Sequence, residues 1–387
     1  MGLRQSVKKE TDIFSGEEFS SNAVRLSNRE IIAATVIVIT VLFLLLPMAW
    51  RKLEPFESEK NFRIAEKYRD DYWAFKLWSD AACKKYPVVF LGDSVIWGMY
   101  SDNESSLPAK INAAAGTEMV ANLAIDGLHS LALKGLLEKY ATEIKNKTVI
   151  LHFNPLWLNS PEYDLSGISP ARPNHPRLLP QFLGKPRAYD EDFGARMDVL
   201  REQNLHFFSL LNHIRLVYFD NSDFKEWMTE HPYSNPAKEL LGKVDYCEKE
   251  KNQNSTVSWE RNNIPKQNWS WIPLEKSRQW NAFLEVLALL KKNDDNVMVL
   301  AGPINKHMLT DESRAKYEQL QACISVALKK QGVPCLLAPD MPSDVYADAS
   351  HPLEKGYGII AVELIKTGFL DEAAGQSLSK RMAVKAN

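Results

Sequence analysis

One stretch decides the fold of this chain: Pro87-Val88-Val89-Phe90-Leu91-Gly92-Asp93-Ser94-Val95-Ile96-Trp97-Gly98. Its four apolar residues, Val88 to Leu91, predict a strand buried on both faces, because parallel strands covered by helices carry such unbroken runs. The strand stops at Gly92, which permits a tight turn, and the turn places Ser94 at the strand's carboxyl end. A helix after the turn would point backbone N–H groups at the serine oxygen. The stretch therefore predicts a nucleophile, with a plain polar turn as the alternative.

Predicted helices and strands alternate on both sides of a long irregular region. Strands are expected at residues 119–123, 148–153, 297–300 and 333–337, and helices at 107–115, 130–144, 274–292, 311–331 and 353–367. This alternation implies parallel strands joined by right-handed crossovers. The fold class is therefore α/β, with about five parallel strands and functional sites at their carboxyl ends.

The remaining segments divide the chain into parts. We expect a flexible tail at 1–30, an apolar segment at 31–50, a helical lead-in at 51–86, an α/β domain at 87–372 and a polar tail at 373–387. The domain carries an insertion at about 155–280 that is rich in Pro, Asn and Trp, with its clearest periodicity at 198–219. The insertion is expected to form a lid or a partner surface, with a poorly ordered loop as the alternative for 247–258.

The apolar segment, IIAATVIVITVLFLLLPMAW at residues 31–50, carries no charge over twenty residues. A helix of that length crosses roughly 30 Å of hydrocarbon. A cleavable signal peptide would be shorter and would end in a small-residue cleavage site, so we expect an uncleaved single-pass anchor. Basic residues flank the segment on both sides, so their count does not decide its orientation.

Composition excludes several classes of function. The 387 residues carry a formal net charge of −2, so no basic field favours nucleic acid. The four cysteines form no CxxC pair, so we expect no structural metal. Cys323 and Cys335 are the most local candidates for a disulfide, and buried free thiols are the alternative.

A second motif, Asp348-Ala349-Ser350-His351-Pro352, precedes the last predicted helix. An aspartate and a histidine three residues apart on one turn can touch, so that the Asp348 carboxylate accepts the Nδ1–H of His351. Nε2 is then free to take a proton from Ser94. A helix-start or surface histidine is the alternative for His351 alone. Asp93, although adjacent to the serine, is expected to brace the turn.

Acyl-transfer chemistry also requires donors for a developing oxyanion. Two candidates follow the second and third predicted strands: Gly127, whose own N–H can approach a substrate closely, and Asn154, whose side-chain amide is an uncharged donor. With the Ser94 N–H they would form the oxyanion hole.

The order of these residues along the chain, serine, glycine, asparagine and histidine, resembles that of the SGNH (GDSL-type) hydrolase superfamily. Its four eponymous residues correspond to Ser94, Gly127, Asn154 and His351, and its triad acid corresponds to Asp348. The resemblance covers residues 88–154 and 297–367, and leaves out the apolar segment, residues 51–86 and the insertion. It implies a three-layer α/β/α, flavodoxin-like fold.

The segment around Asn154 departs from the family's usual Gly-x-Asn-Asp motif, because His152 and Pro155 stand where the motif has its glycine and its aspartate. Two short segments, Asn154-Pro155-Leu156-Trp157 and Gly302-Pro303-Ile304-Asn305, are similar to the extracytoplasmic branch typified by the D-alanyl transfer protein DltD. That branch acts beside membrane-bound O-acyltransferases on cell-envelope polymers. The resemblance implies an extracytoplasmic domain, an acylated glycan or envelope polymer as substrate, and a multi-spanning membrane O-acyltransferase as partner. Trp97, Trp157 and Asn305 are expected to contact substrate.

The sequence predicts a membrane-anchored serine esterase or O-acyltransferase without a cofactor or metal. Hydrolysis and transfer use the same acyl-enzyme at Ser94, so the sequence does not separate them. One alternative is a non-catalytic scaffold that recruits a membrane acyltransferase. Another is a metal-dependent hydrolase built from His129 and His152, which lack a third ligand at useful spacing.

Overall fold

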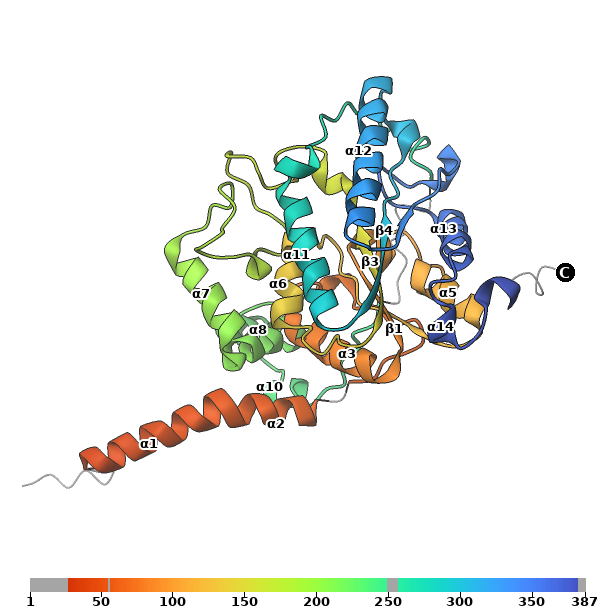
Figure 1. Ribbon diagram of the computed structural model, residues 1–387. Helices are drawn as coiled ribbons and strands as arrows, with labels where there is room; N and C mark the ends of the chain where they lie inside the picture. The colour runs from red at the N-terminus through yellow and green to blue at the C-terminus, as the bar shows by residue number, and fades with distance from the viewer. Residues whose placement is uncertain (1–26, 55, 249–256, 382–387) are drawn as a thin grey trace, which may run out of the picture.

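The computed structural model describes residues 27–54, 56–248 and 257–381 (Figure 1). Most of the predicted N-terminal tail, the end of the C-terminal tail and most of the 247–258 loop therefore lie outside the described residues. A short helix, α14 (Asp371–Ala374), leads into the described part of the C-terminal tail, whose residues 378–381 are also helical.

A five-stranded sheet forms the centre of the domain, in the order β2-β1-β3-β4-β5. All four neighbouring pairs are parallel. The strands are β1 (Val88–Leu91), β2 (Val120–Asn122), β3 (Thr148–Phe153), β4 (Asn296–Ala301) and β5 (Cys335–Leu337). The predicted α/β class with about five parallel strands is therefore confirmed.

Helices cover both faces of this sheet (Figure 1). Val89 and Leu91 point to a core shared with α3 (Tyr72–Lys85), α6 (Ser130–Lys139), α11 (Arg278–Lys292) and α12 (Asp311–Lys330). Val88 and Phe90 point to the opposite core, shared with α5 (Leu107–Ala115) and α13 (Glu354–Lys366). This two-sided burial explains why β1 is apolar without interruption.

Several predicted helices begin or end elsewhere than expected. The predicted helical lead-in contains the end of α2, a 3-10 turn (Glu66–Tyr68) and α3, which starts after the Asp71 side chain accepts the Ala74 N–H. Helix α11 likewise begins after its cap at Ser277, and α6 ends at Lys139 rather than at residue 144. The periodic part of the insertion is two helices, because Leu205 adopts an extended backbone between α7 (Phe193–Asn204) and α8 (His206–Tyr218).

The described part of the insertion also contains α9 (Phe224–Glu230) and α10 (Pro236–Glu239). Two of its tryptophans are buried against the domain, where the Trp271 indole donates to Ser313 and the Trp259 indole to Ser343. The Trp-rich part is therefore packed structure rather than a loose loop.

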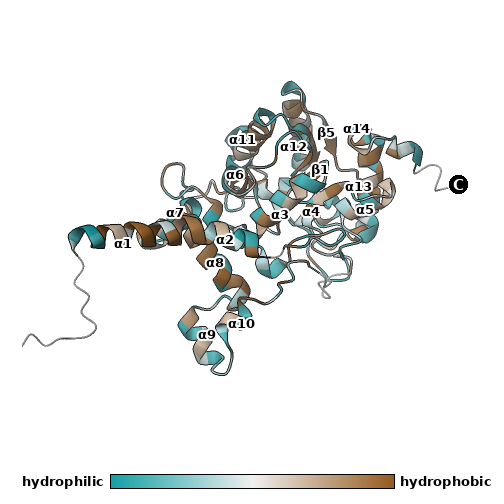
Figure 2. Ribbon diagram, turned by 90° about the horizontal axis from the view of Figure 1, so that it is seen from below, coloured by the Kyte–Doolittle hydropathy of each residue, from teal (hydrophilic) through white to brown (hydrophobic). Residues whose placement is uncertain are grey.

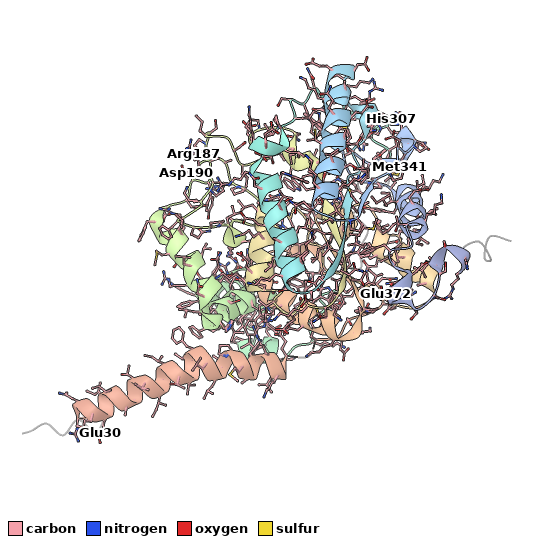
Figure 3. All side chains as sticks on the ribbon, viewed as in Figure 1. Glu30, Arg187, Asp190, His307, Met341 and Glu372 are labelled. Carbon is pink, nitrogen blue, oxygen red and sulfur yellow. The ribbon has the colours of Figure 1, made fainter. Side chains whose placement is uncertain are left out.

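A continuous helix of 26 residues, Asn28–Leu53, projects from the domain (Figure 2). It consists of α1 (Asn28–Thr40), a π-helical turn (Val41–Leu45) and α2 (Leu46–Leu53), and Ser27 and Glu30 form a capping box at its far end (Figure 3). Its mean hydropathy reaches 2.8 and it is largely exposed. The helix is thus long and apolar enough to span a membrane.

The second half of this helix packs against α8. The Phe43 ring lies 5.0 Å from that of Phe207 and 5.8 Å from that of Phe208, and the Trp50 ring lies 5.9 Å from that of Tyr218. The apolar helix is therefore docked on the insertion over its last turns.

Candidate active site

The turn after β1 places Ser94 at the start of a one-turn helix, α4 (Ser94–Trp97). The turn requires glycine at position 92, since a Cβ there would lie 2.7 Å from the Cβ of His152 and 2.8 Å from Cγ1 of Ile96. The Asp93 carboxylate caps the helix by accepting the Val95 N–H at 3.1 Å. Ser94 is thereby held at the carboxyl end of the sheet.

The loop before α13 brings the predicted base to the serine. The Nε2 atom of His351 lies 2.8 Å from Oγ of Ser94, and its Nδ1 atom lies 2.8 Å from both carboxylate oxygens of Asp348. A carboxylate only accepts, so Nδ1 carries a proton, and whenever the ring is neutral an unprotonated Nε2 faces the hydroxyl. The structure thus brings Ser94, His351 and Asp348 into one hydrogen-bonded chain.

The Asp348 carboxylate is fixed by further donors. The N–H groups of Ser350 and His351 each donate to its Oδ1 at 3.0 Å, and the Tyr100 hydroxyl donates to its Oδ2 at 3.2 Å. Burial alone would raise the pKa of Asp348, but His351 and these two backbone N–H groups lower it to about 2. The carboxylate therefore remains charged at neutral pH.

The charge around His351 favours its protonated form. Burial lowers the pKa of His351, but Asp348, Asp93 and Asp126 outweigh burial and raise that pKa above its usual range. An imidazole with a raised pKa accepts a proton from a hydroxyl more readily, which is what a general base requires.

Two backbone N–H groups near the serine lack an acceptor among the described residues. They belong to Ser94, at the start of α4, and to Gly127, the third residue of the turn from Ile125 to Leu128. Gly127 has φ +72°, a left-handed conformation that glycine adopts without strain. Both donors lie beyond the carboxyl ends of strands, β1 and β2 respectively.

Asn154 follows β3 and is held by Asp93. Its Nδ2 atom donates to Oδ2 of Asp93 at 2.8 Å, and its Oδ1 accepts the Leu156 N–H at 3.0 Å. An amide nitrogen has two hydrogens, so one remains for an oxyanion. The side chain is buried, and its orientation is fixed at both ends.

Asp93 stabilises the turn, as predicted, and also contacts residues of β3 and of the segment after it. It is fully buried and also accepts from the Trp157 indole at 3.0 Å, while Nδ1 of His152 lies 3.2 Å from its Oδ1. Burial would raise the pKa of Asp93, but His152 and Asn154 lower it to about 2. A charged Asp93 therefore links the nucleophile turn to the third strand. His152, on β3, supplies one of these partners.

Two of the residues expected to contact substrate, Trp97 and Asn305, are buried among protein partners. Trp97 is 4% exposed, its indole donates to the Ile64 carbonyl, and the Arg63 guanidinium lies over its ring. Asn305 is fully buried, and its Nδ2 donates to the Asp348 carbonyl at 3.2 Å. Both side chains are thus held by other parts of the protein, and their contact with a substrate stays a prediction.

Trp157 is half-buried and lines a cavity of about 260 Å³. The cavity is also lined by His129, Tyr163, Arg172 and Asn174. It adjoins the triad region, because Trp157 donates to Asp93 and the Asn174 side chain lies against Gly127. Trp157 thus faces a cavity beside the serine, and its contact with a substrate stays a prediction.

The two histidines of the metal alternative are engaged elsewhere. Nε2 of His152 lies 2.8 Å from the Gly302 carbonyl, and Nε2 of His129 lies 3.2 Å from the Asn174 carbonyl. Within residues 27–54, 56–248 and 257–381, no group of three or more His, Cys, Asp or Glu is arranged to hold a metal ion. The described cysteines are all free thiols, so the Cys323–Cys335 disulfide is not formed.

Sequence reasoning missed Tyr100, which contacts both partners of the base. Its ring lies 5.2 Å from the His351 ring in an edge-on arrangement, in addition to its hydrogen bond to Asp348. No local motif marks it; its position six residues after the nucleophile is the only signal.

The comparisons with known proteins give no relative for this site. No protein-family model matches the chain, and no curated protein matches it. The class of site is therefore defined by its geometry alone: a serine, a histidine and a carboxylate in hydrogen-bond sequence at the carboxyl edge of a parallel sheet.

Proposed function

We propose that this protein is a membrane-anchored serine esterase or O-acyltransferase of the SGNH type. One observation carries the proposal: Ser94 Oγ, His351 Nε2, His351 Nδ1 and Asp348 form a continuous chain with 2.8 Å contacts. The same constellation performs acyl transfer on unrelated folds, so it is recognised by geometry and roles. The sheet order 2-1-3-4-5, which flavodoxin-like folds share, supports the finer fold assignment.

In the first half-reaction, Ser94 Oγ attacks the ester carbonyl carbon while its proton passes to Nε2 of His351. The N–H groups of Ser94 and Gly127 and the Asn154 amide donate to the oxyanion, each contributing on the order of 3 kcal/mol. The carbon–oxygen bond to the leaving group then breaks, and His351 returns the proton to the departing alkoxide. An acyl ester on Ser94 remains.

In the second half-reaction, water or a sugar hydroxyl attacks the acyl-enzyme. His351 takes the proton of the attacking group and passes it to Ser94 Oγ as the acyl ester breaks. The product is a carboxylic acid when water attacks and a new ester when a glycan attacks. The partition of a labelled acetyl group between water and a glycan acceptor distinguishes the two.

The full chain in detergent is tested with an aryl acetate and a serine-directed fluorophosphonate. We expect one labelled serine and turnover that both disappear in Ser94→Ala. The matched control is Ser101→Ala, since the Ser101 hydroxyl donates to the Gly98 carbonyl instead of facing the base. Labelling that persists in Ser94→Ala contradicts the proposal, and full complementation in cells by both Ser94→Ala and His351→Ala favours a scaffold.

The resemblance to the extracytoplasmic branch supports a domain outside the cytoplasm that acts on an acylated envelope polymer beside a membrane-bound O-acyltransferase. Cys323 offers a test of this topology, because it is an exposed free thiol on α12. A membrane-impermeant maleimide is expected to label it in intact cells. Labelling only after the membrane is permeabilised would place the domain on the cytoplasmic side.

A further inference from the structure

The insertion contacts the proposed oxyanion hole from behind, through the peptide group that joins Asp126 to Gly127. A peptide group is planar and trans, so its C=O and N–H point in opposite directions. Any partner that fixes the Asp126 carbonyl therefore also fixes the direction of the Gly127 N–H. That carbonyl has such a partner in His175.

Nε2 of His175 lies 2.7 Å from the Asp126 carbonyl oxygen. Because a carbonyl only accepts, Nε2 must carry the proton. The His175 side chain is 1% exposed, so water does not compete for this hydrogen bond. A hydrogen bond to the carbonyl also polarises the peptide group and strengthens its N–H as a donor.

The other side of the His175 ring is held by the segment that begins α3. Its Nδ1 atom lies 3.0 Å from the Tyr72 hydroxyl and 3.2 Å from Oδ1 of Asp70. Tyr72 is 1% exposed, so this contact too is shielded from water. The imidazole is therefore anchored at both nitrogens, and the orientation of its Nε2–H does not depend on a bound substrate.

The backbone of the insertion is bent to bring this ring into place. His175 has φ +52°, an uncommon conformation for a residue with a side chain. The preceding residue, Asn174, lies against Gly127, where an added Cβ would come 2.8 Å from its Nδ2. Two adjacent residues of the insertion thus act on this peptide group: Asn174 lies against Gly127, and His175 bonds the Asp126 carbonyl.

We propose that His175 is a positioning residue that orients and polarises the Gly127 N–H through the Asp126 carbonyl. This inference rests on the proposed function, since it assigns a role to the insertion in the same reaction. His175 touches no reacting atom. It acts on a donor that is needed more in the transition state than in the ground state, so its loss lowers kcat more than it changes KM.

The test compares His175→Phe and His175→Gln in the full chain, with aryl-acetate turnover normalised to serines titrated by the fluorophosphonate. We expect kcat to fall about tenfold or more in His175→Phe at a KM within about twofold, approaching the loss of a whole donor of 10²–10³. Gln presents an amide N–H where the imidazole had one, so His175→Gln is expected to recover most of kcat. A purely structural role lowers the number of titrated sites but not kcat per site.

The matched control is His231→Phe. His231 lies in the same insertion and its Nδ1 also contacts a backbone carbonyl, that of Trp227, but it is the C-cap residue of α9. Its replacement is expected to leave kcat unchanged. If His175→Phe does not fold, the double variant Asp70→Asn, Tyr72→Phe loosens the other side of the ring and is expected to lower kcat several-fold at constant KM.

The results distinguish a failure of the proposed Ser94 chemistry from a failure of the proposed role of His175. Turnover that is absent or independent of Ser94 in the wild-type chain overturns the proposed function and this inference with it. Turnover that depends on Ser94, yet is unchanged per site in His175→Phe or in the double variant, overturns the inference alone. An equal loss in His175→Phe and His175→Gln also overturns it, because then the donor is not what matters.

Discussion

His351 and His213 both lie against buried carboxylates, but the second ring nitrogen of each faces a different group. In the triad, His351 has Asp348 on one nitrogen and the Ser94 hydroxyl on the other, and its side chain is 13% exposed. In a second group, here called the anchor cluster, His213 lies between Glu54 and Asp71. All three side chains of the anchor cluster are at most 1% exposed.

The difference lies in what the second nitrogen faces. Nε2 of His213 is 2.8 Å from Glu54 and its Nδ1 is 2.7 Å from Asp71, so both nitrogens donate and the ring is a cation. Burial opposes this charge, but Asp71 and Glu54 raise the pKa of His213 to about 9. His351, with a hydroxyl in place of the second carboxylate, can be neutral and accept a proton. His351 therefore has one nitrogen available to a hydroxyl, whereas both nitrogens of His213 are engaged by carboxylates.

The anchor cluster joins three parts of the chain. Glu54 follows the apolar helix, Asp71 caps α3, and His213 lies on α8 of the insertion. The Tyr218 hydroxyl and the Trp73 indole also donate to Glu54, at 3.1 and 3.2 Å. The cluster therefore fixes the end of the membrane-spanning candidate to the domain.

Replacement of His351 or Asp348 is expected to have the largest effect, a loss of activity without a loss of stability. In His351→Ala and Asp348→Asn we expect kcat for an aryl acetate to fall by about 10³–10⁴, because the base or its orienting group is lost. The melting temperature is expected to change little. A large drop in melting temperature with full activity per folded molecule would reverse the comparison between the two clusters.

The corresponding change in the anchor cluster is expected to act on stability. His213→Leu leaves two buried carboxylates without their cation, which costs about 3–5 kcal/mol in the free energy of unfolding. Denaturant unfolding measures this loss, while kcat per titrated serine stays at the wild-type value. Tyr218→Phe is the control for a single lost hydrogen bond, and is expected to cost about 1 kcal/mol. Equal losses in the two variants would argue against a charged His213.

Alkaline pH is expected to weaken the anchor cluster next. The folded-state pKa of His213, about 9, lies above its unfolded value near 6.5, so protonation stabilises the native state. This stabilisation is fully present below pH 6.5 and is lost as pH rises through 9, with a size on the order of 3 kcal/mol. Unfolding measured from pH 6 to 10 should show the decline in wild type and not in His213→Leu. A decline of equal size in both would assign it to other groups.

The smallest expected effect is a shift in the pH dependence of kcat/KM when the charge of Asp126 is removed. His351 must be neutral to act as a base, so kcat/KM rises with pH through its pKa, which is above the usual range. Asp126 contributes to this raised pKa, so Asp126→Asn is expected to move the acid limb to lower pH by a fraction of a unit. The alkaline plateau stays within a few-fold of wild type. A limb that does not move would show that Arg69, which pairs with Asp126 at 2.8 Å, already cancels its charge.

The sequence by itself predicted the sheet and the two short motifs that meet at Ser94 and His351, because each of these features depends on a local pattern. Four apolar residues ending in Gly92-Asp93-Ser94 specify a buried strand and the turn that follows it. Asp348 and His351 lie on one turn, so their contact needs little beyond the chain's own geometry. Gly127 and Asn154 follow strands whose carboxyl ends meet at one edge of the sheet.

Tertiary structure alone decided which polar side chains surround these elements. Trp97 and Asn305 are expected from the sequence to contact a substrate, and packing buries both against other parts of the protein. His175 reaches the Asp126 carbonyl across 49 residues, and His213 reaches Glu54 across 159. No periodicity or motif records such contacts, because they arise only when distant segments pack. Short-range spacing thus specified the Asp348–His351 pair and the turn at Ser94, whereas long-range packing brought these two motifs together across 257 residues and placed His175 and His213 against their partners.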